Sequence, residues 1–550
     1  MIKTTAWVFG ALGAMWLGLT PVALSNLMQQ SSIGELGIDA LKLHGPPYNL
    51  TGRKIAIGQV EIGRPGQFGI DKAVSRNRGV SVMRVFFRNV PAKVNVNLDP
   101  HAQNVASIMI GNDKALQGVA PDARLYASAV GLMKRNGQPE ECLSTQHVAQ
   151  QNGGDVRAIN FSFGESLRED PRPQAVLDGN ALLTQCLDWS ARVHDVVYVV
   201  AGNQGKGGIP IPTDNFNGVN VAFSSRYRPN LEAGESQGLG LFSKVDFANL
   251  GDTVSSFASR VSGIENNIGP RRAISLVAPG NGVPIMNPDG KVTRGSGTSF
   301  AAPHVTATVA LLQEHGDRQL RTRQPNWSTD SRRHEVMKAI LMNSADKIKD
   351  SGDGLFLGMS RTLLNKANQD WLTSDAYQDR IIPLDMQMGT GHLNAFRAYL
   401  QLSPGQFGPG PAIPPIGWDY RSVGAPSGTG KLPAFRDYVL ERPLKAGSFV
   451  SLTLVWDRVV ELKDLNNNGE FDLGEGFEDK GLNNLDLYLM RADEMDTGKS
   501  IDASISEVDS VEHIFFPIPQ TGRYKIRVVY RQQVNQPVQS YGLAWWTVPN

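Results

Sequence analysis

Short, continuous apolar runs bounded by turn residues recur in the N-terminal part of the chain. Residues 55–60, 158–163 and 196–201 are three such runs. Each lacks the apolar–polar alternation of a half-exposed strand, so each predicts a strand that is buried on both faces. Gly164-Glu165 and Gly202-Asn203 end the second and third runs as turns.

Helical patterns alternate with these runs. One continues through residues 105–110 after His101, and another covers residues 299–312, with Pro303 tolerated early in the helix. Strands that alternate with helices predict the α/β class, with a mostly parallel sheet between layers of helices. In such sheets the functional site forms at the carboxyl ends of the strands.

The pattern changes near Leu402. Residues 403–411 read SPGQFGPGP, and we predict a Pro/Gly-rich linker over residues 403–420. Beyond it the apolar runs are short and rich in β-branched or alternating positions, at residues 449–456, 485–489, 511–518 and 524–530. We therefore predict a second domain, an all-β sandwich, over residues 421–550.

The N-terminus resembles an export signal. Lys3 precedes an uncharged apolar run over residues 6–19, and Ala23-Leu24-Ser25 offers a small-x-small cleavage site. We predict a cleaved signal peptide over residues 1–25, with a retained membrane anchor as the alternative. The first domain then covers residues 26–402. We expect a secreted or periplasmic protein with no stable membrane span after cleavage.

Composition excludes some classes of partner. The 550 residues include 54 Lys or Arg and 53 Asp or Glu, so the charge balance does not favour nucleic-acid binding. The two cysteines, Cys142 and Cys186, are free to pair in an oxidising compartment, but the sequence does not show whether they meet. Neither lies in a motif that would activate a catalytic thiolate.

Four separated polar residues form a candidate catalytic set. Ser299 begins a helix among small residues, where the helix N-terminus favours a developing oxyanion. His101, at another helix start, is placed to take the serine proton. Asn203 supplies an amide donor for the oxyanion, and Glu61 ends the first strand as the carboxylate.

The motifs around these residues resemble those of the subtilase family of serine peptidases. Residues 297–305 read GTSFAAPHV, and residues 118–121, 159–164, 277–280 and 389–395 give supporting matches. The chain order of acid, histidine, asparagine and serine is also that of the family. The resemblance implies hydrolysis of protein or peptide substrates through an acyl-enzyme. It also implies that Ser162 and Gly164 border the substrate cleft.

Three departures from the family pattern stand out. Glu61-Ile62-Gly63 replaces the usual Asp-Ser/Thr-Gly, and a register two residues shorter would place Gln59 at the acid position. Glutamate is chemically competent, because the third member of the triad orients the imidazole and stabilises its cation. Ala102-Gln103 stands where Gly-Thr is usual, and residues 26–50 are fewer than an inhibitory propeptide domain needs.

Residues 464–475 match a twelve-residue calcium loop. Oxygen-bearing side chains fall at positions 1, 3, 5, 9 and 12, Gly469 is at the sharp turn, and Glu470 would offer its backbone carbonyl. The predicted ligands of a structural Ca²⁺ are Asp464, Asn466, Asn468, Glu470, Asp472 and Glu475. The alternative is a solvated acidic turn.

The sequence thus predicts a secreted serine endopeptidase with a Ser-His-Glu triad, an Asn oxyanion donor and no catalytic cofactor. The main alternative is a catalytically silent binding protein on the same fold, which the Glu61 departure keeps open. A Glu-dependent serine peptidase of the sedolisin type is disfavoured by the context of His101. His304 and His392 are interpreted as structural.

Overall fold

The computed structural model describes residues 32–74, 79–133, 136–202, 210–227, 240–246, 271–426 and 432–550. The predicted signal peptide, residues 1–25, lies outside these ranges. Within the described part of the chain, none of the helices combines the length and apolar character that crossing a membrane requires.

A nine-stranded, mostly parallel sheet forms the centre of the N-terminal part. Its middle strands are parallel to one another: β8 (Val197–Ala201), β7 (Val156–Phe161), β1 (Ala56–Glu61) and β6 (Arg124–Ala129). The outer strands are β2 (Arg84–Phe87), β3 (Val90–Pro91), β9 (Val219–Tyr227), β10 (Leu241–Asp246) and β11 (Leu276–Pro279). The central strands are buried over nearly their whole length, as their continuous apolar sequences predict.

Helices cover both faces of this sheet. Helices α3 (Pro100–Ile110) and α8 (Thr298–Arg321) share one apolar core with one face, and α4 (Gln138–Ala149) and α6 (Leu182–His194) share another core with the opposite face. Other helices and short strands among the described residues of this part are α2 (Leu41–His44), α5 (Gln151–Gly154), α9 (His334–Asn343), α10 (Asp375–Gln378), α11 (Ala395–Leu402), β4 (Asn112–Asp113), β5 (Leu116–Gln117), β12 (Val283–Met286) and β13 (Val292–Gly295). The predicted α/β class, a mostly parallel sheet between helices, is confirmed.

The C-terminal part is an all-β sandwich, also as predicted. One sheet has the order β14-β16-β23-β20-β21, and the other has the order β15-β24-β17-β22. Apolar side chains from both sheets form the core between them. The strands of the two sheets are β14 (Gly410–Ile413), β15 (Ile416–Gly424), β16 (Phe435–Leu440), β17 (Phe449–Trp456), β20 (Asn484–Arg491), β21 (Asp502–Ser504), β22 (Val511–Pro517), β23 (Tyr524–Gln532) and β24 (Val538–Trp546).

The stretch predicted as a linker is largely structured. Strand β14 and the first half of β15 lie within residues 403–420, where β14 pairs with β16 and β15 pairs with β24. Pro and Gly there end α11 and open the edge strand β14, a position where missing N–H groups do little harm.

The two parts share one continuous apolar core. Along β17, Leu454 points into the sandwich, whereas Val455 points outward and packs with the α8 and α9 core. Trp418 and Ala544 join the same inter-domain cluster. At Gly542 a Cβ would lie 2.7 Å from the backbone of Glu335, so glycine allows β24 to pack directly on the start of α9.

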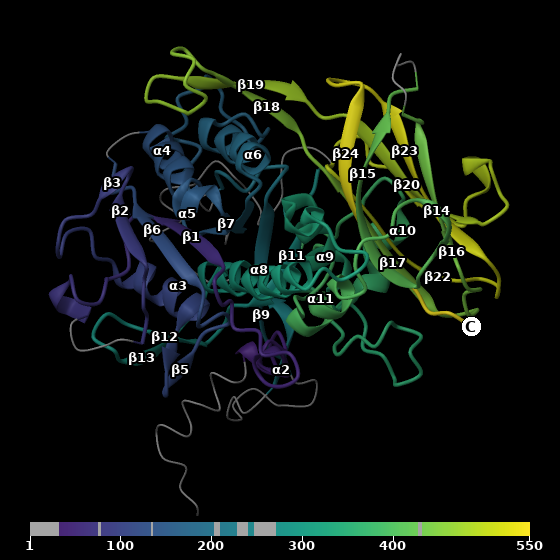
Figure 1. Ribbon diagram of the computed structural model, residues 1–550, viewed down its shortest axis with the longest axis horizontal. Helices are drawn as coiled ribbons and strands as arrows, with labels where there is room; N and C mark the ends of the chain where they lie inside the picture. Colours follow the sequence, from purple (N-terminus) through teal and green to yellow (C-terminus); the bar gives the residue numbers. More distant parts are fainter. Residues whose placement is uncertain are drawn as a thin grey trace, which may run out of the picture.

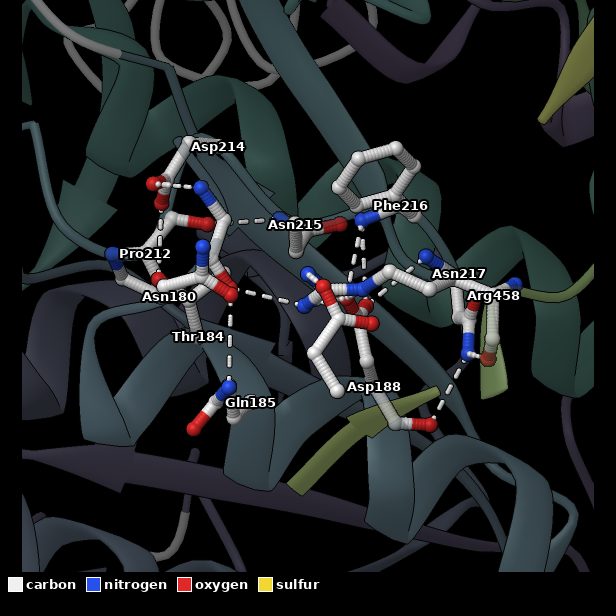
Figure 2. A network of polar contacts seen from close by, with 12 residues as sticks. Asn180, Thr184, Gln185, Asp188, Pro212, Asp214, Asn215, Phe216, Asn217 and Arg458 are labelled. Carbon is white, nitrogen blue, oxygen red and sulfur yellow. Dashed lines mark hydrogen bonds and ion pairs between the residues drawn. The ribbon is translucent and has the colours of Figure 1, made fainter. Parts of the chain in front are cut away.

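Arg458 connects the sandwich to the α/β part through buried polar contacts (Figure 2). Its guanidinium donates to Asp188 Oδ2 of α6 at 2.6 and 3.0 Å and to the Gly179 carbonyl at 2.7 Å. Asn217 bonds the Arg458 backbone on both sides, and the guanidinium lies 4.4 Å from the centre of the Phe216 ring. Both charged groups are almost fully buried, so they depend on each other for solvation.

A second connection is the hairpin of β18 (Val459–Lys463) and β19 (Gly476–Gly481), which reaches from the sandwich across α4 and α6 (Figure 1). Phe471 and Phe477 of this hairpin pack with Trp189 around the Cys142–Cys186 disulfide, which joins α4 to α6. The pairing of the two cysteines, left open by the sequence, is thus decided, and a thiolate function is excluded.

Candidate active site

A carboxylate and an imidazole meet at the carboxyl end of the central strand. Glu61 is the last residue of β1, and its Oε2 lies 3.4 Å from Nδ1 of His101, the second residue of α3. The Glu61 side chain is 1% exposed, whereas His101 is 38% exposed. A buried carboxylate therefore contacts one imidazole nitrogen while the ring remains accessible from solvent.

Neighbouring residues fix the entry of α3. The Asp99 side chain caps the helix by accepting the His101 N–H at 2.9 Å, and Pro100 occupies the first turn, where no N–H is needed. Gln59, the alternative at the acid position, contacts the backbone of α3 instead. Its amide donates to the Ala102 carbonyl at 2.9 Å and ties β1 to the same helix.

The loop after β1 is held against α3. Gln103, one of the departures from the family pattern, accepts the Gly66 N–H at 2.9 Å. At Gly63 a Cβ would lie 2.3 Å from the Asp99 Cβ, so glycine is needed for this close approach. These contacts set the separation between Glu61 and His101.

The charge environment of His101 favours its protonated form. Burial acts against the charge, but the Coulombic attraction and hydrogen bond of Glu61, aided by Asp99, raise the pKa of His101 above its ordinary value. This is the environment expected for a base that becomes an imidazolium during the reaction.

Ser299 lies in the first turn of α8. Its Oγ donates to the Ser162 carbonyl at 3.1 Å, and the ring of the next residue, Phe300, lies 5.7 Å from the His101 ring. The serine and the histidine are thus brought to one region from residues far apart in the sequence.

Pro303 changes the hydrogen bonding of this turn. Because proline has no N–H, the Ser299 carbonyl lacks its usual partner four residues on. The Ser162 hydroxyl donates to that carbonyl instead, at 3.0 Å, and Asn160 donates to the Ser162 hydroxyl at 2.8 Å. The end of β7 is therefore joined to the start of α8.

The predicted cleft residues follow β7. Ser162 is buried and occupied by the bonds just described, while Gly164 is half-buried. The next residue, Glu165, pairs its backbone with Ile211 at 2.8 and 3.1 Å. Ser162 thus contacts Ser299, and Gly164 continues the same segment.

Asn203, the predicted oxyanion donor, lies outside the described residues. The residue before it is placed: the Gly202 carbonyl accepts the Thr298 hydroxyl at 2.8 Å. The end of β8 is therefore joined to the residue directly before Ser299.

Three further titratable residues of the described chain have partners of their own. Asp71 forms a buried pair with Arg64 at 2.7 and 2.9 Å. Burial lowers the pKa of His304 to about 4, and burial also lowers the pKa of His392, which contacts Ser224 at 2.9 Å. Both histidines are therefore buried and neutral at ordinary pH.

The oxygen-bearing side chains of residues 464–475 bond within the loop. Asp464 accepts the Gly469 N–H at 2.7 Å, and Glu475 accepts the N–H groups of Leu465 and Asp472 at 2.8 and 2.9 Å. Asn466 and Asn468 each donate to Asp472 at 2.8 Å. The Glu470 side chain instead accepts the side-chain amide of Gln150, the residue after α4, at 3.0 Å, which leaves the Glu470 backbone carbonyl as the atom predicted to face an ion.

A second polar cluster escaped the sequence reasoning. It comprises Asp195 at the end of α6, His334 and Glu335 at the start of α9, and Asp457 after β17. In the sequence, the adjacent pair His334-Glu335 is only a weak indication of a polar site, and no local pattern predicts that Asp195 and Asp457 lie beside it.

The sequence of this chain is similar to those of known serine peptidases. The model of the family described as "Subtilase family" matches residues 63–366, which include His101 and Ser299 and begin just after Glu61.

Several curated proteins are similar over part of their length. Thermitase of Thermoactinomyces vulgaris is 23% identical over 269 residues, which cover 49% of this chain and 74% of thermitase. Pyrolysin of Pyrococcus furiosus is 30% identical over 205 residues, covering 36% of this chain and 14% of that protein. Subtilisin DY of Bacillus licheniformis is 27% identical over 220 residues, covering 40% of this chain and 65% of that protein. The chain therefore spans widely different shares of the relatives it matches.

Among solved structures, a prenylagaramide maturation protease matches 63% of this chain and 93% of its own, at 19% identity and a TM-score of 0.39. A cold-adapted subtilisin-like serine proteinase matches 58% of this chain and 92% of its own, at 18% identity and a TM-score of 0.36.

Proposed function

Because this chain belongs to the subtilase family of serine-type endopeptidases, we propose that it hydrolyses peptide bonds with Ser299 as nucleophile, His101 as general base and Glu61 as the orienting carboxylate. The contact that carries the proposal is the one between buried Glu61 and His101 Nδ1, at 3.4 Å. Protein or peptide chains are the proposed substrates.

In the first step, the Ser299 hydroxyl turns from the Ser162 carbonyl toward His101. Its oxygen attacks the scissile carbonyl carbon as its proton passes to His101 Nε2. Glu61 keeps Nδ1 as the donor and stabilises the imidazolium that forms. The first-turn N–H groups of α8 and the Asn203 amide are the proposed donors to the oxyanion.

In the second step, His101 returns the proton to the leaving amine, and the peptide bond breaks to leave an acyl-enzyme on Ser299. Water then attacks this ester with His101 again acting as base, which releases the acid product and regenerates the serine hydroxyl. Substrate backbone is proposed to lie along the segment that contains Ser162 and Gly164.

Two further features complete the proposal. The first is export: the segment over residues 1–25 is proposed to direct the enzyme out of the cytoplasm. The second is a calcium site. The loop over residues 464–475 is proposed to hold a structural Ca²⁺, because the carboxylates of Asp464 and Asp472 accept bonds within one short loop and the Asn466 and Asn468 amides point at Asp472. Rotation of the Asn466 and Asn468 amides would present their oxygens to the ion.

A fluorophosphonate serine probe tests the central claim. We expect the mature protein to be labelled at Ser299 and Ser299→Ala to show no labelling, since only an activated hydroxyl attacks such reagents. Ser296→Ala, which alters an exposed hydroxyl three positions earlier, is the matched control and should label like the wild type. A folded wild-type protein that stays unlabelled would instead favour a catalytically silent binding protein.

A further inference from the structure

The polar cluster between α6, α9 and the sandwich is separate from the proposed triad. Asp195 caps the carboxyl end of α6, and His334 and Glu335 begin α9. One ligand atom from each of these three residues lies within 4.8 Å of the other two. His334 Nδ1 is 2.9 Å from Asp195 Oδ1 and 3.2 Å from Glu335 Oε2.

These separations suit a small divalent ion. Ligand atoms at 2.0–2.1 Å from a tetrahedral zinc lie about 3.3 Å from one another. The two distances from His334 Nδ1 are close to this value, so a modest outward movement of the side chains would admit an ion.

One ligand atom is buried without a hydrogen bond. Glu335 is 5% exposed, and its Oε2 has no hydrogen-bond partner within the described part of the chain. Its other oxygen, Oε1, accepts the Tyr420 hydroxyl at 3.4 Å. A buried carboxylate oxygen that faces an imidazole nitrogen without a hydrogen bond is costly unless a cation neutralises it.

The second ring nitrogen of His334, Nε2, also contacts a carboxylate. His334 Nε2 lies 3.1 Å from both oxygens of Asp457, a buried residue of the sandwich. Metal-binding histidines commonly donate their second N–H to a carboxylate, which orients the ring and leaves the other nitrogen for the ion.

We propose that Asp195, His334 and Glu335 bind one divalent transition-metal ion, with zinc as the best match. The mixed imidazole and carboxylate set favours zinc over Ca²⁺, which takes six to eight oxygen ligands. The Asp195 side chain is 30% exposed and offers a path for entry. The ion would replace a proton on Nδ1, which contacts Asp195 Oδ1 at 2.9 Å in its absence.

The ion would act at the junction of the two domains. Asp195 and the α9 residues belong to the α/β part, whereas Asp457 orients the ligand from the sandwich and directly precedes the buried Arg458. Metal binding would therefore stabilise the packing of the sandwich on α9.

Two titrations of chelator-treated full-length protein test this site. ZnCl₂ binding is measured by calorimetry, and binding of Co²⁺, used as a probe in a separate sample, is measured by its visible absorption. We expect one zinc with a dissociation constant in the micromolar range or below. Glu335→Gln should weaken binding at least tenfold. Asp457→Asn should weaken it by about tenfold, as is usual for a carboxylate that orients a metal-binding histidine without touching the ion.

Two matched variants exclude other sites. Asp464→Asn alters the proposed calcium loop, and His101→Ala removes the triad histidine, so both should bind zinc like the wild type. Asp195→Ser provides a second ligand deletion at the exposed rim if Glu335→Gln fails to fold. Lack of zinc and cobalt uptake by the wild type, or unchanged affinity in the ligand variants, would overturn the proposal.

Discussion

At the scale of single residues, the distinctive feature of the site is a glutamate, Glu61, in the proposed acid position. Its side chain is one methylene longer than aspartate and reaches His101 from the last position of β1. The close approach at Gly63 and the Gln103 bond to Gly66 hold the intervening loop against α3. The longer acid is thus accompanied by local contacts that set its distance to the imidazole.

Replacement of this acid by an amide tests its role. Glu61→Gln should leave the fold intact but reduce kcat by up to about 10⁴-fold, because an amide favours the wrong imidazole tautomer and does not stabilise the cation. Glu61→Asp should retain more activity than Glu61→Gln, although its shorter arm reaches His101 less well. The measurement is steady-state hydrolysis of a peptide substrate.

Gln59→Ala is the control for that experiment. Gln59 lies two positions earlier on the same face of β1 and bonds a backbone carbonyl, so its loss should reduce kcat far less. Near wild-type turnover in Glu61→Gln would show that the acid has been assigned to the wrong residue.

The pKa of His101 makes a prediction about pH. A general base acts only when neutral, and Glu61 raises the pKa of His101 above its ordinary value despite burial. The rise of kcat/KM with pH should therefore have its midpoint above about 6.5. In Glu61→Gln the midpoint should move to lower pH, because the attraction that favours the imidazolium is removed; an unmoved midpoint would contradict this coupling.

At the scale of elements, buried polar contacts decide how strands and helices of the two domains meet. Arg458, between β17 and β18, pairs with Asp188 of α6 where neither group reaches solvent. Such a pair contributes little net stability compared with apolar residues, but removal of one partner leaves an uncompensated charge. The pair thus specifies a docking geometry more than it adds stability.

Removal of this arginine should be strongly destabilising. Arg458→Met should lower the free energy of unfolding by about 3–5 kcal/mol, measured by denaturant titration. The double variant Asp188→Asn/Arg458→Met should be less destabilised than the sum of the two single variants, because it removes both charges.

Arg380→Met is the matched surface control. Its ion pair with Asp502 leaves the arginine side chain 48% exposed, so its loss should change stability by at most about 1 kcal/mol. Equal effects of Arg458→Met and Arg380→Met would contradict the anchoring role of Arg458.

At the scale of the whole molecule, the β18–β19 hairpin extends from the sandwich across α4 and α6 (Figure 1). The Phe471 backbone bonds Gln146 of α4 at 2.6 and 3.2 Å, next to the disulfide between α4 and α6. The proposed calcium loop therefore lies at the contact between the domains, so a change in the loop's conformation would disturb its bonds to α4.

Calcium removal should consequently lower the stability of both domains. Chelation should lower the melting temperature, because a ligand bound only by the folded state stabilises it by mass action. Hydrogen exchange should accelerate in α4 as well as in the loop. Asp464→Ala should reduce both responses, whereas Asp289→Ala, a change to an exposed aspartate elsewhere, should not. Melting curves unaffected by chelator would remove calcium from the proposal.

The sequence by itself determined the features that depend on neighbouring residues. Continuous apolar runs predicted β1, β7 and β8, because strands buried on both faces need apolar residues at every position. The motif around Ser299 predicted the start of α8, and the change of pattern after Leu402 predicted the sandwich. The role assigned to Asn203 and the export signal remain predictions from sequence alone.

Only the tertiary structure decided which distant residues meet. The cysteine pairing, the Arg458–Asp188 contact and the meeting of Asp195 with His334 join residues 44, 270 and 139 positions apart. Periodicity and turn chemistry act over a few residues, whereas these meetings depend on the order of strands and the docking of one domain on another. The contact between Glu61 and His101 lies between these cases: each residue was placed by its motif, but their distance was set by the packing of α3 on β1.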